Sequence, residues 1–424
     1  SYNTAVGYNS LLTVSTGAAN TAIGYRSLEL LTTGGNNTGL GGRALNSQTT
    51  ASQNTAVGQQ ALRYNQTGGN NVSVGFEALR GVSGNSHNDN TAVGVQSMKS
   101  ITTGGSNVSL GHQSLYSNTI GGNNVSLGVG SMYTNTNSSH TVAIGWRALN
   151  QLNGGASNNA IGTSSQRYNE TGIQNTSFGY QALMGSSGNS HNYNTAIGAS
   201  SQLVMTGSSN SSLGSSTLSN ATSANYNVAV GSMALNELTT GDSNIGIGLS
   251  ASRYNETGAD NVAIGFEALK GVSGNSHSNN TAIGYESMKG TTTGNKNVAV
   301  GTSSLSASTT SIGNTATGYH ALKDVTTGGY NVSMGYLALA NADGAENSNT
   351  ALGAFSAMDM DNDGSIENTY VGIYAGMGGT GLVTNNTVVG GYAFRRIGDN
   401  NATYNTAMGK FSMGAVWAGA SNYN

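Results

Sequence analysis

The densest group of side chains able to bind a cation lies near the C-terminal end of the chain. Residues 359–367 read Asp-Met-Asp-Asn-Asp-Gly-Ser-Ile-Glu, so three carboxylates alternate ahead of the turn residue Gly364. This is the first half of a calcium loop, because calcium takes several converging oxygen ligands. The twelfth loop position holds Tyr370 in place of the usual bidentate glutamate. The pattern indicates either a weak calcium site, with the Ser365 carbonyl as a further ligand, or a solvated acidic loop. The side chains expected to bind the metal are Asp359, Asp361, Asp363 and Glu367.

Three of the six histidines end matched insertions in the sequence. The insertions read Gly-(Val/Ser)-Ser-Gly-Asn-Ser-His and cover residues 81–87, 185–191 and 271–277. Imidazole nitrogens are common metal ligands, so these side chains could share a metal where chains meet. The alternative is a surface-loop histidine that hydrogen-bonds within its own turn. We call His87, His191 and His277 the insert histidines.

These candidate sites are embedded in a short repeat. The pentapeptide Asn-Thr-Ala-Val-Gly, first at residues 3–7, returns in 24 related copies, and 15 of the 23 spacings between copies are 17 residues. A fixed short period predicts a repeat architecture. We call each repeat a rung and count its positions from its Asn as position 0. Position 4 is Gly in all 24 rungs, position 3 is apolar in all but one, and positions 2 and 7 are mostly small.

Seventeen residues fit two short strands and two turns, so we expect an all-β fold, a parallel β-solenoid of about 24 coils. Positions 1 and 3 should share one strand face, and position 4 should mark a bend or a close backbone approach. Apolar residues at positions 3 and 8 are expected to meet in the core, and small residues at positions 2 and 7 to form a flat face for other chains. The Asn at position 0 should form a side-chain ladder between rungs or supply a left-handed turn, and the two are compatible. The position-3 residues expected inside include Ile23, Val57, Val74, Leu127, Ile144, Ile197, Ile264 and Val300. Their position-8 partners include Leu28, Leu62, Leu79, Leu149, Leu235, Leu269 and Leu322.

The regularity of the repeat changes along the chain. Residues 1–330 hold regular rungs, whereas the spacing loosens over residues 331–424, which include the acidic loop at 359–367. We expect this looser segment to continue the rod as a cap or a junction.

Position 5 is aromatic in nine rungs. Exposed aromatic faces beside Asn and Gln could hold sugars, and packing along the rod or between chains is the alternative. The nine residues are Tyr8, Tyr25, Phe76, Trp146, Tyr180, Phe266, Tyr285, Tyr319 and Tyr336.

The pattern Asn-x-(Val/Thr)-Ala-(Ile/Val)-Gly-x-x-(Ala/Ser), read at residues 70–78 and 123–131 with Ser in place of Ala and with Leu127 in the second stretch, resembles the head repeat of YadA-type trimeric autotransporter adhesins. Runs such as residues 20–28 and 314–322 also resemble repeats of bacteriophage tail fibres. The return segment of each rung is longer than in the adhesin head. The resemblance implies a left-handed β-roll and a homotrimer.

Composition narrows the function classes further. Only 8% of residues are charged, the net charge is −3, and Lys and Arg are scattered, so we expect no nucleic-acid partner. No apolar run approaches the roughly 18 residues of a membrane helix, so we expect no membrane insertion. Cys is absent, which excludes disulfides and thiolate metal sites. No catalytic set stands out, and we expect no enzyme. The chain opens in mid-pattern, which is typical of a segment of a longer protein.

Together these features predict a structural fibre or stalk of an extracellular adhesive appendage. The leading interpretation is a phage tail fibre on the virion surface that presents a tip to a host cell-surface glycan or protein. The alternative is a bacterial surface adhesin of the trimeric autotransporter kind. A remote alternative, an ice- or surface-binding solenoid, would need a regular threonine row, whereas Thr and Val mix irregularly at position 1. Calcium is the one cofactor expected.

Overall fold

The strands of this protein are short and all follow one pattern. A computed structural model describes residues 2–342, 344–360, 364–378, 381–395, 401–413 and 421–422. Each rung places a parallel strand at positions 1–3, directly after its Asn, and no helix is found in the described residues. The chain divides into two compact units, Ser1–Ser209 and Asn210–Asn424. The all-β solenoid expected from the 17-residue period is confirmed, with 24 strands in the parallel sheet.

The strands of the first unit are β1 (Thr4–Val6), β2 (Thr21–Ile23), β3 (Thr38–Leu40), β4 (Thr55–Val57), β5 (Val72–Val74), β6 (Thr91–Val93), β7 (Val108–Leu110), β8 (Val125–Leu127), β9 (Val142–Ile144), β10 (Asn159–Ile161), β11 (Thr176–Phe178) and β12 (Thr195–Ile197). Those of the second unit are β13 (Ser211–Leu213), β14 (Val228–Val230), β15 (Ile245–Ile247), β16 (Val262–Ile264), β17 (Thr281–Ile283), β18 (Val298–Val300), β19 (Thr315–Thr317), β20 (Val332–Met334), β21 (Thr350–Leu352), β22 (Thr369–Val371), β24 (Thr387–Val389) and β26 (Thr406–Met408). A second, three-stranded sheet holds β23 (Val383–Thr384), β25 (Ala402–Thr403) and β27 (Ser421–Asn422).

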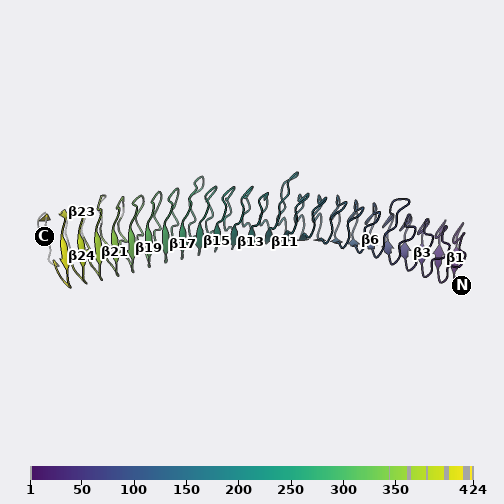
Figure 1. The fold of residues 1–424 in the computed structure, drawn as a ribbon, viewed down its shortest axis with the longest axis horizontal. Coiled ribbons are helices and arrows are strands. Elements are labelled where there is room, and N and C mark those ends of the chain that lie inside the picture. The colour runs from purple at the N-terminus through teal and green to yellow at the C-terminus, as the bar shows by residue number, and fades with distance from the viewer. Residues whose placement is uncertain are drawn as a thin grey trace. The chain divides into compact units, whose positions relative to one another are not determined.

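Within each unit, each strand pairs with the same strand of the next rung in exact register. Thr4 lies beside Thr21, and Ala5 beside Ala22, so equivalent positions form columns along the solenoid. Figure 1 shows the strands side by side in each unit, with the return segments rising from the same side of the sheet. The prediction of two strands per rung is wrong for most of the chain. The return segments are turns and bends, and among the described residues a regular second ladder is formed by β23, β25 and β27.

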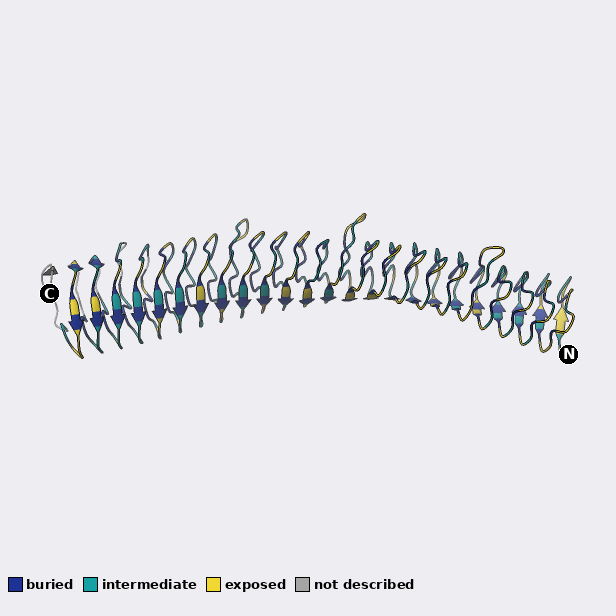
Figure 2. Cartoon of the chain, in the orientation of Figure 1, coloured by how far each residue is buried: buried dark blue, intermediate teal, exposed yellow. Residues whose placement is uncertain are grey.

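The two faces of the strands are the reverse of the predicted ones. Position 2 points into the solenoid, and its Ala, Ser and Gly residues are buried in every rung after the first, as are the small residues at position 7 in most rungs. Position 3 points outward, so none of the eight named core candidates is buried, and Ile23 is 41% exposed. Figure 2 shows this alternation along the strands.

Space explains the reversal. A 17-residue coil brings the strand against the wall that carries positions 7 and 8. A Cβ added to Gly39 at position 2 would lie 2.6 Å from the Ser27 Oγ and 3.5 Å from Leu28. The inner strand face therefore accepts small side chains, and the branched ones remain outside.

The predicted burial of position 8 is confirmed, but its predicted contact with position 3 is wrong, because position 3 lies outside. All seven named leucines are fully buried and form the apolar column of the interior. Burying a leucine contributes roughly 1.5–3 kcal/mol, so this column carries much of the stability of each rung.

One C-terminal rung shows how tightly these positions are coupled. Tyr370 occupies inward position 2 and is 1% exposed, where the other rungs have Ala, Ser or Gly except for Val388 in the Asn386 rung. Position 8 of the same rung is Gly376, and a Cβ added there would lie 2.1 Å from the Tyr370 ring. The tyrosine thus fills the volume that a leucine fills elsewhere, which is a volume-conserving exchange across the interior.

The Gly column at position 4 has two independent causes, as predicted. These 24 glycines have φ between +109° and +150°, a region that side chains rarely adopt. A Cβ at Gly145 would also lie 2.5 Å from the carbonyl oxygen of Gly162 in the next rung. The column marks a bend at which successive backbones touch.

The Asn at position 0 forms the predicted ladder. The Oδ1 of Asn314 accepts hydrogen bonds from the Asn331 backbone N–H at 2.9 Å and from its Nδ2 at 3.0 Å. The Nδ2 of Asn314 donates to the Gly328 carbonyl at 2.8 Å, across the interior. The left-handed conformation lies one residue before the Asn, as at Ala19 and Gln53, so that interpretation of position 0 is wrong.

Candidate functional site

The acidic loop is only partly described. Asp361 and Asp363 lie outside the described residues, whereas Asp359 accepts a hydrogen bond from the Asn341 Nδ2 at 2.7 Å and Glu367 is exposed. The carbonyl of buried Ser365 accepts from the Asn349 Nδ2 at 2.9 Å, so it is engaged inside the solenoid rather than in the predicted ligand set. Within the described ranges, no group of three or more His, Asp or Glu side chains is placed to hold a metal. The calcium site stays a prediction.

The insert histidines are not surface residues, which corrects the predicted turn contact. His87, His191 and His277 are 0–2% exposed, and a Cβ added to Gly81 would contact the His87 Nε2 at 3.4 Å. Burial lowers the pKa of each imidazole from 6.5 to about 4. The insertion turns position 11 outward, so that Val82 is 45% exposed, and the histidine fills the space that Leu31 fills in an ordinary rung. Buried neutral imidazoles inside separate rungs are a structural feature, not a shared metal centre.

The aromatic residues at position 5 form an exposed stripe. All nine are at least 38% exposed. Neighbouring rings stack along the stripe, with centroid distances of 5.7 Å for Tyr8 and Tyr25 and 5.1 Å for Phe266 and Tyr285. Packing along the solenoid is therefore confirmed for these pairs, and it leaves only the outer ring edges and faces to a ligand.

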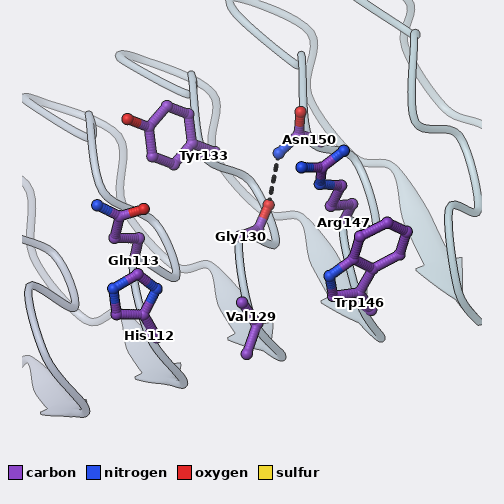
Figure 3. Close-up of a pocket in the computed structure, with 8 residues that line it drawn as sticks. All are labelled: His112, Gln113, Val129, Gly130, Tyr133, Trp146, Arg147 and Asn150. Atoms are coloured by element: carbon purple, nitrogen blue, oxygen red, sulfur yellow. Dashed lines mark hydrogen bonds between the residues drawn. The ribbon is translucent and has the colours of Figure 1, made fainter.

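Trp146 lies in a different setting, beside a surface cavity of about 450 Å³ in the first unit. The cavity spans three successive rungs, those of Asn107, Asn124 and Thr141. Figure 3 shows Tyr133 and Trp146 on either side of Gly130, which also lines the cavity. The lining residues are His112, Gln113, Val129, Gly130, Tyr133, Trp146, Arg147 and Asn150.

Gly130 opens this cavity because it interrupts a row of side chains at position 6. The other 23 rungs have a side chain there, each at positive φ, and Gly130 shares that conformation with φ +63°. In the same row the Nε2 of Gln113 donates to the Oε1 of Gln96 at 3.0 Å. The missing side chain leaves a gap between Gln113 and Arg147, and a Cβ added to Gly130 would meet nothing closer than 3.6 Å.

Polar groups surround the gap. The Nδ2 of Asn150 donates to the Gly130 carbonyl at 2.7 Å, which fixes the amide at the rim. The Gln113 side-chain oxygen points toward the gap (Figure 3). The Arg147 guanidinium carbon lies 4.6 Å from the centroid of the Trp146 ring, a cation–π contact. No acidic residue lines the cavity, and among the described residues Arg147 forms no ion pair.

A second cavity, of about 550 Å³, lies beside the insertion at residues 271–277 in the second unit. Its two cations are neutralised locally. Lys270 Nζ lies 2.8 Å from Glu267, and Lys289 Nζ lies 2.7 Å from Glu267 and 2.9 Å from Glu286. This closed network leaves less charge for a ligand than the unpaired Arg147 does, so the Gly130 cavity is the stronger binding candidate.

Sequence reasoning named Trp146 and missed Gly130 and Arg147. The signal was present, because Gly130 is the single glycine at position 6 in 24 rungs. In comparisons, no family model and no curated protein matches this chain. No described helix is long and apolar enough to cross a membrane.

Proposed function

We propose that this chain is a fibre or stalk segment of an extracellular adhesive appendage of the phage tail-fibre kind, which holds a host-binding tip away from the particle. The observation that carries the proposal is the in-register stacking of whole rungs. Backbone hydrogen bonds join successive rungs at the strands and also in the return segments, as from the Leu28 N–H to the Ala44 carbonyl at 3.0 Å. A structure bonded to its neighbour all round each coil suits a load-bearing element better than a reaction centre.

The outer strand face supports assembly of several such chains. Positions 1 and 3 present Val, Ile, Leu and Phe outward, and Val108, Leu110 and Phe178 are 42%, 51% and 57% exposed. Position 1 is Thr in 13 of the 24 rungs and Val or Ile in nine, so the apolar residues form a stripe along position 3 that widens where position 1 is also apolar. An exposed apolar stripe of this kind marks an interaction site. The small residues at positions 2 and 7, first expected to make this face, lie inside the coil. We propose a homotrimer that packs through positions 1 and 3, with the left-handed coil that the adhesin resemblance implies.

Gold-labelled antibodies against the purified chain test this function on the particles or cells that produce it. Label along virion tails is the expected result. Label on a bacterial cell surface would support the autotransporter-like alternative instead, and label confined to the cell interior would overturn both. The outer face does not support the ice-binding alternative, which needs a regular row of threonines. Among the described strands, Thr occupies both position 1 and position 3 only at Thr315–Thr317.

We also propose that the loop at residues 359–367 binds calcium weakly, with a dissociation constant of about 0.1–1 mM. Clustered carboxylates repel one another unless a cation or solvent screens them, and Glu367 lies exposed at the end of the loop. Calorimetric titration should show calcium heat that Asp361→Ala removes. Absence of heat at millimolar calcium would leave only the solvated loop.

A further inference from the structure

We propose that the cavity at Gly130 binds a single acidic sugar unit, a uronic acid within a surface polysaccharide. This inference deepens the proposed adhesive function and rests on it for its biological role. The binding chemistry itself stands on the cavity alone.

Size and lining indicate a sugar ring. The cavity of about 450 Å³ is open at the surface and has an aromatic ring on either side of Gly130. A pyranose has an apolar C–H face that packs against an aromatic ring and a rim of hydroxyls that need hydrogen-bond partners. The amides of Gln113 and Asn150 offer such partners, since a side-chain amide oxygen accepts from two directions.

Charge selects an acidic sugar over a neutral one. Arg147 is the one permanently charged residue in the lining, and no carboxylate of the described chain pairs with it. Its guanidinium is held against Trp146, so it is already ordered before a ligand arrives. A planar guanidinium matches a carboxylate with two parallel hydrogen bonds, which is the contact a uronic acid supplies and a neutral hexose lacks.

The repeat itself supplies the test variants. Gly130→Gln restores the side chain that Gln96 and Gln113 carry at the same position and at the same positive φ, so it should fill the gap without disturbing the fold. Arg147→Gln removes the cation, and it is also a mild substitution, because other rungs already have Gln at position 6. Arg43→Gln makes that same exchange in a rung outside the cavity and is the matched control.

The probes are a trigalacturonate and the corresponding neutral galactose trimer. Their binding is measured by the change in tryptophan fluorescence of a protein that carries Trp417→Phe. This substitution leaves Trp146 as the one tryptophan of the two in the chain. We expect saturable binding of trigalacturonate, at least tenfold tighter than the neutral trimer. Gly130→Gln should abolish it, Arg147→Gln should weaken it at least tenfold, and Arg43→Gln should leave it unchanged.

Three results would overturn the inference. They are equal binding of both trimers, no binding of either trimer at about 10 mM, and full binding of trigalacturonate by a folded Gly130→Gln protein. An unchanged melting temperature for Gly130→Gln confirms that the variant is folded. Failure here is distinguishable from failure of the proposed function. Surface labelling with antibodies stays positive if only the sugar site is wrong, and trigalacturonate binding persists if only the localisation is wrong.

Discussion

Removing one amide from the Asn ladder should destabilise its rung far more than a surface substitution. In Asn314→Ala the Asn331 N–H loses the Oδ1 acceptor at 2.9 Å, and the Gly328 carbonyl loses the Nδ2 donor at 2.8 Å. Asn331 is fully buried and Gly328 is buried, so water cannot replace these bonds without opening the rung. Each buried group left without a partner costs about 1–3 kcal/mol, which gives a loss of about 2–6 kcal/mol.

The assay is native-state hydrogen exchange, because a solenoid opens rung by rung and a global melt would dilute a local effect. At about 1.4 kcal/mol per factor of ten, exchange of the Asn331 amide and its strand neighbours should accelerate at least 25-fold. Asn314→Asp should be at least as damaging, since it replaces the donor with a buried negative charge facing a carbonyl.

The converse variant is available in the first unit. Thr141 is the one residue at position 0 that is not Asn, and its N–H still bonds to the Asn124 Oδ1 at 3.1 Å. Thr141→Asn should restore the ladder and slow exchange locally. Exchange near Asn331 that changes less than threefold in Asn314→Ala would refute the claim that the ladder stabilises the rungs.

Three further predictions follow from the interior. Gly145→Val places a side chain 2.5 Å or less from the Gly162 carbonyl at unfavourable φ and should cost about 4 kcal/mol or more, measured by urea unfolding; tolerance of Val would contradict the close approach. Leu149→Ala should lower the free energy of unfolding by about 2–5 kcal/mol, whereas Ile144→Thr on the outer face should change that of the dissociated chain by under about 1 kcal/mol. Equal losses in the two variants would contradict the assignment of position 8 to the inside and position 3 to the outside. Burial lowers the pKa of the insert histidines from 6.5 to about 4, so they take up protons more readily in the unfolded chain. Their contribution to stability should be full above pH 6.5 and should fall as the pH drops from 6.5 to 4, by about 3 kcal/mol per histidine. A triple His→Gln variant should lose that part of the acid sensitivity in thermal melts at pH 7 and 4.5, and identical pH dependence of variant and parent would contradict it.

The fold could be predicted because its columns repeat in the sequence. Gly at position 4 and Asn at position 0 recur in nearly every rung, and each contacts the backbone of the equivalent residue in the next rung, as Gly145 and Gly162 show. The facing of the strand could not be read from the same pattern. Three-residue strands alternate only once, so apolar residues at positions 1 and 3 fit an inner or an outer face equally well. The contact between position 2 and the opposite wall determines which strand face points inward, and this contact depends on the width of the coil.

The candidate sites show a similar division. The insertion before His87 is plain in the sequence, but only the structure shows Val82 turned outward and the imidazole turned in. The Gly130 cavity depends on what its neighbours leave open, since Ser164 at the same position of another rung is small yet buried. A column of residue types therefore locates an irregularity, and the side chains of adjacent rungs determine whether it becomes a cavity.

The central claim is that the apolar outer face makes this chain an assembling fibre element, and the mass in solution tests it most directly. Sedimentation equilibrium of the purified chain at micromolar concentration should give three times 42.8 kDa, about 128 kDa. The mass should stay constant on dilution, because a stripe of apolar side chains buried along successive rungs gives a strong interface. A stable monomer of 42.8 kDa with positions 1 and 3 open to solvent would contradict the account.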